Sequence, residues 1–317
     1  MLTRRDCLTY TATTCAASAL WPKLANAQAN DVIRRAIPGT GEEIPIIGLG
    51  SSATFSQLAM ADDLDPLKEV FQTMVDAGGT VFDTAPSYGR GSAEEAAGRI
   101  TAELGLTDRI FWATKVNVAG FGGGSADPAQ ARDQIERSFE LIGLDPIDLI
   151  QVHNVADVPT QLGILKELKE DGRVRYIGTT STSKRQYEAL AQWMRTEPLD
   201  FIGIDYAVDN TSATDEILPI ARDRGIAVMV YMPFGRTRLW NRVAGHEVPE
   251  FAREFGVESW AQFFLKFAGA HPDVTTVTPA TSKAHHMLDN MGAGIGRLPD
   301  AAEQQRMVEF IDALPQA

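Results

Sequence analysis

Residues 147–179 decide the fold: they contain IDLIQVH at 147–153, TQLGILKELKE at 160–170 and VRYIGT at 174–179. The first and last of these stretches are short and rich in apolar and β-branched residues, which predicts strands. The middle stretch is amphipathic, which predicts a helix. Two strands joined through a helix lie parallel in one sheet.

The same unit recurs along almost the whole chain. We expect strands at 46–50, 80–83, 110–116, 147–153, 174–179, 200–206, 226–231 and 274–278, and helices at 66–77, from 92, and at 128–142, 160–170, 184–195, 213–224 and 259–269. Such regular alternation over roughly 250 residues favours the α/β class and a closed (β/α)8 TIM barrel over an open doubly wound sheet. A turn at 38–41 (PGTG) predicts an N-terminal β-hairpin that caps the bottom of the barrel. No G-x-G-x-x-G follows the first strand, which argues against a Rossmann domain.

Composition narrows the class of protein further. Apolar residues make up 44% and charged residues 22% of the 317 residues, as in ordinary globular chains. The formal net charge of −13 disfavours binding to nucleic acid, because such a surface repels phosphate backbones. No apolar run reaches the ~18 residues of a spanning helix, so stable membrane insertion is not expected.

The first 27 residues have the features of an export signal. The segment TRRDCL at 3–8 resembles a twin-arginine motif, a weakly apolar stretch follows, and ANA at 25–27 is an A-x-A cleavage pattern. We therefore expect a twin-arginine (Tat) signal peptide at 1–27, a single barrel domain at 28–317, the Tat machinery as a partner, and a periplasmic protein. A mitochondrial-type presequence or a disordered tail is the alternative. Both cysteines, Cys7 and Cys15, lie in this segment, so the exported domain can form no disulfide.

Polar residues stand at the ends of three neighbouring strands, where barrels of this kind carry their chemistry. Asp83 ends the second strand and Tyr88 follows in the next loop, Lys115 lies near the end of the third strand, and His153 ends the fourth. Burying the Lys115 ammonium without a partner would cost several kcal/mol, so a counter-ion is required. Asp83 on the neighbouring strand is the obvious one. We expect the four side chains to converge on one catalytic site.

These residues lie in segments that resemble the aldo/keto reductase family: DTAPSYG at 83–89, ATKV at 113–116 and QVHN at 151–154. The similarity extends over about residues 44–290. It implies a (β/α)8 barrel, NADPH as cofactor with NADH as a second candidate, and reduction of an aldehyde or ketone. It also implies that Tyr88 is the proton donor, that Lys115 and Asp83 are its supporting ion pair, and that His153 orients the substrate carbonyl.

The residue types suit that chemistry. Hydride transfer to a carbonyl carbon places negative charge on its oxygen, and a proton donor at that oxygen lowers the barrier. A phenol remains protonated at neutral pH, and a neighbouring ammonium stabilises the phenolate that is left. No cluster of His, Asp and Glu has metal-ligand spacing, so no metal is expected.

The resemblance also implies a cofactor site, with departures from the family pattern. Thr180 and Ser181 stand where relatives have Ser-Asn, Gly203 stands where a Gln holds the nicotinamide amide, and Tyr206 matches the aromatic residue that stacks on the nicotinamide. The other implied cofactor residues are Pro233, Phe234, Gly235 and Arg236 after the seventh strand, and Thr281, Lys283, His286 and Asn290 near the last helix.

Two loop features bear on ligands. Phe55 after the first strand and Trp240 in the long insertion after the seventh strand are candidates for the substrate pocket. Arginines at 236, 238 and 242 make that insertion basic, for which pyrophosphate contact and solubility are both open explanations. A 2′-phosphate is best held by Arg or Lys, and this chain offers Lys283 and a partly charged His286. We therefore expect weak discrimination between NADPH and NADH.

Two other functions remain open on the sequence. A non-catalytic nicotinamide-binding or regulatory protein could use the same barrel, but binding alone needs no acid with a supporting ion pair. A carboxylate-based glycoside hydrolase needs two carboxylates flanking a sugar, and only one strand-end Asp is found, opposite Lys115.

Overall fold

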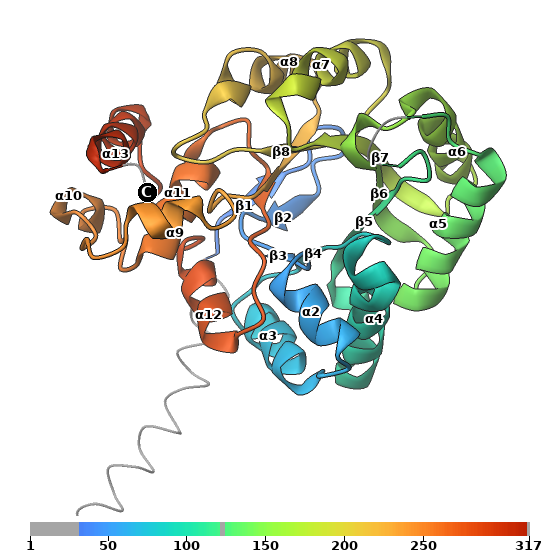
Figure 1. Cartoon of the computed structure of the whole chain (residues 1–317), viewed down its shortest axis with the longest axis horizontal. Helices are drawn as coiled ribbons and strands as arrows, with labels where there is room; N and C mark the ends of the chain where they lie inside the picture. Colours follow the sequence, from blue (N-terminus) through green and yellow to red (C-terminus); the bar gives the residue numbers. More distant parts are fainter. Residues whose placement is uncertain (1–31, 121–123, 316–317) are drawn as a thin grey trace, which may run out of the picture.

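Eight parallel strands form the centre of the molecule (Figure 1). In the computed structural model, which describes residues 32–120 and 124–315, each strand pairs with the next one in the chain. They are β3 (Leu49–Gly50), β4 (Val81–Asp83), β5 (Phe111–Val116), β6 (Ile147–Val152), β7 (Val174–Ser181), β8 (Phe201–Asp205), β9 (Ala227–Tyr231) and β10 (Thr276–Val277). Parallel bridges from Ile47 to Val277 and from Gly50 to Ala280 join the first strand region to the last. The sheet therefore closes, and the predicted (β/α)8 barrel is confirmed.

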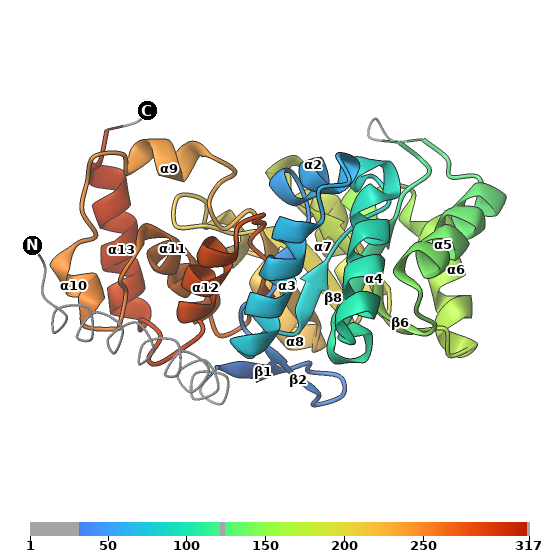
Figure 2. The ribbon, with the colours of Figure 1, turned by 90° about the horizontal axis from the view of Figure 1, so that it is seen from below.

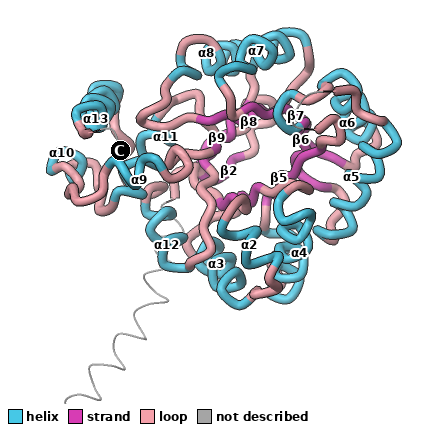
Figure 3. Tube along the Cα trace, in the orientation of Figure 1, coloured by secondary structure: helices cyan, strands magenta, loops and turns pink. Residues whose placement is uncertain are grey.

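Helices surround this barrel on the outside (Figure 3). The longer ones are α3 (Asp65–Asp76), α4 (Ser92–Leu104), α5 (Pro128–Ile142), α6 (Val158–Glu170), α7 (Tyr187–Thr196), α8 (Ile217–Arg224), α11 (Trp260–Ala270), α12 (Ala284–Gly292) and α13 (Ala301–Ala313). Short helices α2 (Thr54–Met60), α9 (Arg238–Arg242) and α10 (Glu250–Arg253) lie in the connections. No helix of the described residues is long and apolar enough to cross a membrane.

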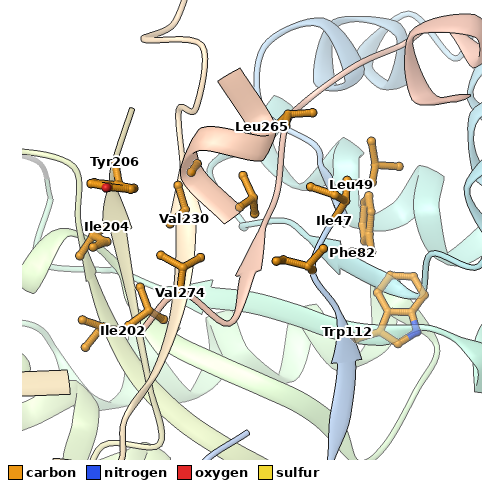
Figure 4. Close-up of a cluster of buried hydrophobic side chains, with 14 of the residues drawn as sticks. Ile47, Leu49, Phe82, Trp112, Ile202, Ile204, Tyr206, Val230, Leu265 and Val274 are labelled. Carbon is orange, nitrogen blue, oxygen red and sulfur yellow. The ribbon is translucent and has the colours of Figure 1, made fainter. Parts of the chain in front are cut away.

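Strand alternation divides the apolar residues into two layers. Ile202 and Ile204 of β8 belong to the same buried apolar cluster as Leu265 of α11 (Figure 4). Phe201, which alternates with them, belongs to a separate cluster inside the barrel. Alternate residues of every strand are thus buried on opposite faces, which explains why the strands read as continuous apolar runs.

The N-terminal hairpin closes the lower end of the barrel, as expected. Strands β1 (Arg34–Ala36) and β2 (Glu43–Pro45) pair antiparallel, and Ile37 and Ile44 join the inner cluster. Tyr176, near the start of β7, donates to Glu42 at 2.7 Å and accepts from the Thr40 hydroxyl at 2.9 Å. Figure 2 shows the hairpin on the side opposite α2. The strand ends that carry the polar residues therefore lie at the other, open end.

The structure differs from the sequence prediction at helix α2 and at the start of helix α4. Helix α2 follows the first strand, where a loop was expected. A Ser-x-x-Glu pattern at 92–95 predicts a capping box for α4, but Ser92 makes no cap hydrogen bond and Gly91, at φ 93°, precedes the helix instead. The reciprocal capping pair forms at Asp300 and Glu303 of α13.

The expected signal peptide at 1–27 lies outside the described residues.

Candidate active site

A buried ion pair lies at the open end of the barrel. Lys115 of β5 and Asp83 of β4 are 1% and 2% exposed. The Lys115 Nζ donates to both carboxylate oxygens of Asp83 at 2.8 Å and to the Thr84 carbonyl at 2.7 Å. Burial lowers the pKa of Lys115, but the charges and hydrogen bonds of Asp83 and Tyr88 together outweigh burial and leave that pKa above its ordinary value. The ammonium is therefore charged at neutral pH.

Tyr88 and His153 complete the group of four that the sequence predicted. Tyr88 begins a 3-10 turn (Tyr88–Gly91) after β4, and its ring centroid lies 5.2 Å from the Lys115 Nζ. The His153 ring, just beyond β6, meets the Tyr88 ring edge-on at 6.0 Å between centroids. The structure thus brings all four side chains together at one rim of the barrel, while their roles stay predictions.

The protonation states of these rings follow from their burial. Burial raises the pKa of Tyr88, and the charge of Lys115 only partly opposes that shift. The phenol is therefore protonated at neutral pH and is able to donate. Burial, helped by the charge of Lys115, lowers the pKa of His153 to about 3. His153 is consequently a neutral hydrogen-bonding group rather than a cation.

A fifth member of the group, Tyr231, is not among the sequence candidates. Its hydroxyl donates to Asp83 Oδ1 at 3.0 Å and accepts from Gln151 Nε2 at 2.9 Å. Its ring centroid lies 5.0 Å from the Lys115 Nζ. The signal was present, because Tyr231 ends strand β9 as Asp83 ends β4. The same strand-end rule could have found it.

Tyr206 does not have the role that the sequence resemblance implies for it, so this prediction is wrong. The residue is 2% exposed and stacks on Phe267 of α11 at 5.5 Å, with His271 edge-on at 5.8 Å. It continues the outward alternation of Ile202 and Ile204, so its ring faces the helix layer and leaves no face for a nicotinamide.

Phe55 is likewise not a pocket residue. It lies on α2, is fully buried, and packs against Phe71 at 6.1 Å and Phe82 at 5.5 Å. The unexpected helix turns this side chain into the layer between strands and helices. Trp240, by contrast, is 38% exposed and contacts Phe234 and Phe264 at 5.0 and 5.6 Å.

Thr180 and Ser181 end strand β7 and are buried. The Thr180 hydroxyl accepts from the backbone amide of Asn154 at 3.0 Å, which leaves its proton available to donate. The Ser181 hydroxyl donates to Gln186 at 2.9 Å and accepts from the Ser183 amide at 3.2 Å. Of the two, Thr180 keeps more capacity to bind a ligand.

The loop after β9 contains the next group of expected cofactor residues: Pro233, Phe234, Gly235 and Arg236. Arg236 is exposed, lies at φ 59°, and has no carboxylate within salt-bridge distance among the described residues. Arg238 donates to Asp209, and Arg242 lies 3.7 Å from Asp312. Internal pairing therefore accounts for two of the three arginines, and only Arg236 is left for a pyrophosphate.

The remaining expected cofactor residues lie around helix α12. Lys283 precedes the helix and is exposed, and its amide donates to the Thr281 hydroxyl at 3.2 Å. Partial burial, and then the neighbouring charges of His285 and Lys283, lower the pKa of His286. His286 therefore adds little positive charge at neutral pH. Asn290 is 3% exposed near the other end of the helix.

Comparison with known proteins identifies the family. The model of the aldo/keto reductase family matches residues 46–310, which contain the whole barrel and the group around Lys115. The chain belongs to the aldo/keto reductase family.

Two curated relatives are similar to part of the chain. The chain is 30% identical over 201 residues to the aldo-keto reductase YhdN of Bacillus subtilis, a match that covers 62% of this chain and 60% of that protein. It is 27% identical over 229 residues to the NADH-specific methylglyoxal reductase of Escherichia coli, covering 65% and 69% of the two chains. The chain thus spans about three fifths of the length of the first of these relatives and just over two thirds of the second.

Solved structures of aldo-keto reductases share the fold. One from Klebsiella pneumoniae in complex with NADPH has a TM-score of 0.71 and 23% identity, over 90% of this chain and 97% of that one. A holo form from Bacillus halodurans has a TM-score of 0.69 and 21% identity, over 90% and 97% of the two chains.

The residues of this aldo/keto reductase fit a nicotinamide dinucleotide. The Gln151 Oε1 is buried without a hydrogen-bond partner among the described residues, so an acceptor is available near Tyr231. Thr180 could hold the nicotinamide end, and Arg236 and Lys283 could hold the phosphates. The described residues contain no group of three or more His, Cys, Asp or Glu placed to bind a metal ion.

Proposed function

We propose that the chain reduces a small aldehyde or ketone, or oxidises the corresponding alcohol in reverse, with NADPH as cofactor and NADH as a second candidate. The observation that carries this proposal is the buried Asp83–Lys115 pair with Tyr88 5.2 Å from the ammonium. A phenol beside a buried ammonium is an acid whose conjugate base is stabilised. The neutral His153 beside it is a hydrogen-bond partner for a carbonyl.

The nicotinamide, when bound, supplies the hydride that the carbonyl carbon accepts. Tyr88 donates its proton to the carbonyl oxygen as negative charge develops there. Lys115 remains charged through its contacts with Asp83 and stabilises the tyrosinate that is left. His153 orients the carbonyl with a neutral ring nitrogen. In the reverse direction Tyr88 accepts the proton of the alcohol.

A fluorescence titration and a single substitution test this function. Tryptophan fluorescence is titrated with NADPH and separately with NADH, and turnover is followed with an aromatic aldehyde. Tyr88→Phe should lower kcat by about 10²–10⁴-fold, the usual contribution of a general acid, and leave the nucleotide Kd unchanged.

Tyr176→Phe is the matched control, because it removes a phenol hydroxyl at the closed end of the barrel, and it should keep its activity. Full turnover in Tyr88→Phe would refute the acid assignment. Nucleotide binding without turnover of any carbonyl would favour the non-catalytic alternative, and failure to bind either nucleotide would refute the cofactor assignment.

Export through the twin-arginine route is part of the proposal. The pattern TRRDCL at 3–8, followed by ANA at 25–27, supports it. The route carries folded proteins, so the cofactor is loaded in the cytoplasm. Cell fractionation should find a shortened protein in the periplasm, and replacing Arg4 and Arg5 by Lys should retain the full-length chain in the cytoplasm. An uncleaved wild-type protein in the cytoplasm would show that this localisation is wrong.

A further inference from the structure

Asp83 receives one donor more than its ion pair with Lys115 provides. Both of its oxygens accept from the Lys115 Nζ, and Oδ1 also accepts from the Tyr231 hydroxyl at 3.0 Å. A buried carboxylate is stabilised by each hydrogen bond to its charged form. Tyr231 therefore acts on the same anion that keeps Lys115 charged.

The direction of this hydrogen-bond chain is fixed by chemistry. An ionised carboxylate only accepts, so the single Tyr231 proton points at Asp83. The Tyr231 oxygen is then left to accept, and the Gln151 amide nitrogen donates to it at 2.9 Å. Gln151 is fully buried, which holds this orientation in place. The chain runs from Gln151 through Tyr231 to Asp83.

Gly203 provides the space that this arrangement requires. A Cβ added at Gly203 would lie 2.2 Å from Cε2 and 2.8 Å from the hydroxyl oxygen of Tyr231. Both distances are shorter than real Cβ contacts, so a side chain at 203 would displace the Tyr231 ring. This gives a physical reason for the glycine that stands on β8 where the family resemblance implies a glutamine.

We propose that Tyr231, held by Gln151 and admitted by Gly203, is a positioning residue that maintains the Asp83 carboxylate and, through Lys115, the proton donor Tyr88. The role rests on the function proposed above. In that role Tyr231 acts through Asp83, to which its hydroxyl donates.

The groups that face Asp83 determine how its titration should respond. They are Lys115 on β5, Tyr231 on β9 and Tyr88 in the turn after β4, while His153 after β6 and Glu94 of α4 interact with the charge of Lys115. Burial raises the pKa of Asp83 above the ordinary 3.8, and Lys115 and Tyr231 oppose that shift. Removing the Tyr231 hydroxyl should therefore raise the pKa of Asp83 further.

The same hydrogen bond makes the stability of the fold depend on pH. The Tyr231 hydrogen bond stabilises the fold while Asp83 is ionised, and this contribution is lost as pH falls through the wild-type pKa of Asp83. The difference in unfolding midpoint between wild type and Tyr231→Phe should be full at neutral pH. It should shrink as pH falls towards the ordinary Asp value of 3.8. Equilibrium urea unfolding at a series of pH values measures it without any turnover.

Tyr206→Phe is the control, because Tyr206 is a buried tyrosine just after the neighbouring strand β8 whose hydroxyl has no carboxylate partner among the described residues. The difference in unfolding midpoint between wild type and Tyr206→Phe should not change with pH. A Tyr231→Phe difference that is equally constant would overturn the proposal and leave Tyr231 as a packing residue. This outcome is independent of whether the wild-type protein reduces carbonyls, which the aldehyde assay decides separately.

Kinetics supply the second readout. In Tyr231→Phe the acid limb of kcat/KM for carbonyl reduction should move up by about one pH unit, the size expected when a buried carboxylate loses one donor. Gly203→Ala should move it in the same direction, because the new methyl group displaces the Tyr231 ring. If Tyr231→Phe does not fold, Gln151→Met removes the donor that orients Tyr231 and should give a smaller shift of the same sign. An unshifted acid limb in these variants would overturn the proposal.

Discussion

Lys115 interacts with more neighbours than an ion pair requires. Its ammonium contacts both oxygens of Asp83 and the Thr84 carbonyl, and the centroids of the Tyr88 and Tyr231 rings lie 5.2 and 5.0 Å from it. A buried cation of this kind adds little net stability compared with an apolar residue, because its desolvation offsets its attraction. Under the proposed function its value at this position is chemical, since it would stabilise a phenolate at Tyr88.

Breaking the pair from one side should therefore be costly. In Lys115→Met, Asp83 remains buried without a counter-ion, and we expect the free energy of unfolding at neutral pH to fall by about 3–5 kcal/mol. Urea unfolding measures it. Adding Asp83→Asn to Lys115→Met removes the unpaired charge and should restore part of that stability, although not activity.

Lys266 supplies a control for this prediction. It is 1% exposed on α11 and donates to the carbonyls of Ile295 and Arg297, with no carboxylate partner among the described residues. Adding Asp83→Asn to Lys266→Met should restore none of the lost stability. A similar recovery in both backgrounds would mean that the Asp83–Lys115 pair is not the cause.

At the level of elements, the cofactor cations lie in two separate segments, the loop after β9 with Arg236 and the start of helix α12 with Lys283. His286 is close to neutral, so Lys283 is the one charged group near that helix start which the sequence assigns to a 2′-phosphate. Discrimination between the two nucleotides then depends on about one charge-assisted contact, worth about 1.5–3 kcal/mol. The ratio of NADH to NADPH dissociation constants should accordingly stay below about a hundredfold.

Lys283→Ala tests this assignment. The Kd for NADPH should rise about tenfold or more, and the Kd for NADH should hardly change, since only NADPH carries the 2′-phosphate. Tryptophan fluorescence titration measures both constants. His286→Ala is the control and should change the ratio much less. Equal losses for the two nucleotides in Lys283→Ala would place Lys283 at the pyrophosphate or outside the site.

Helices and strands could be predicted where the hydrophobic pattern is long, and the prediction failed where that pattern is short. The seven-residue helix α2 carries too little pattern to be distinguished from a loop, and Phe55 was assigned to the pocket for that reason. Tyr206 and Tyr231 show the same limit at strand ends. Both residues end or follow a strand, and only the register of β8 and β9 tells that the first ring faces helix α11 and the second faces the barrel interior.

Across the whole molecule, the order of elements was enough to predict the barrel. Parallel strands separated by helices can close in few ways, so eight repeats predict the architecture without any knowledge of side-chain contacts. The convergence of Asp83, Tyr88, Lys115 and His153 follows from that closure. The hydrogen bond from Gln151 to Tyr231 could not be predicted in this way. It depends on the space left at Gly203, and in the sequence that space is visible only as a residue without a side chain.

The hairpin of β1 and β2 has a consequence for how ligands reach the site. Ile37 and Ile44 belong to the inner apolar cluster, so side chains fill the lower end of the barrel and the polar strand ends lie at the opposite end. Under the proposed function, nucleotide and carbonyl compound would both reach the polar strand ends from that opposite end. Whichever of the two lies deeper would then have to bind first and leave last.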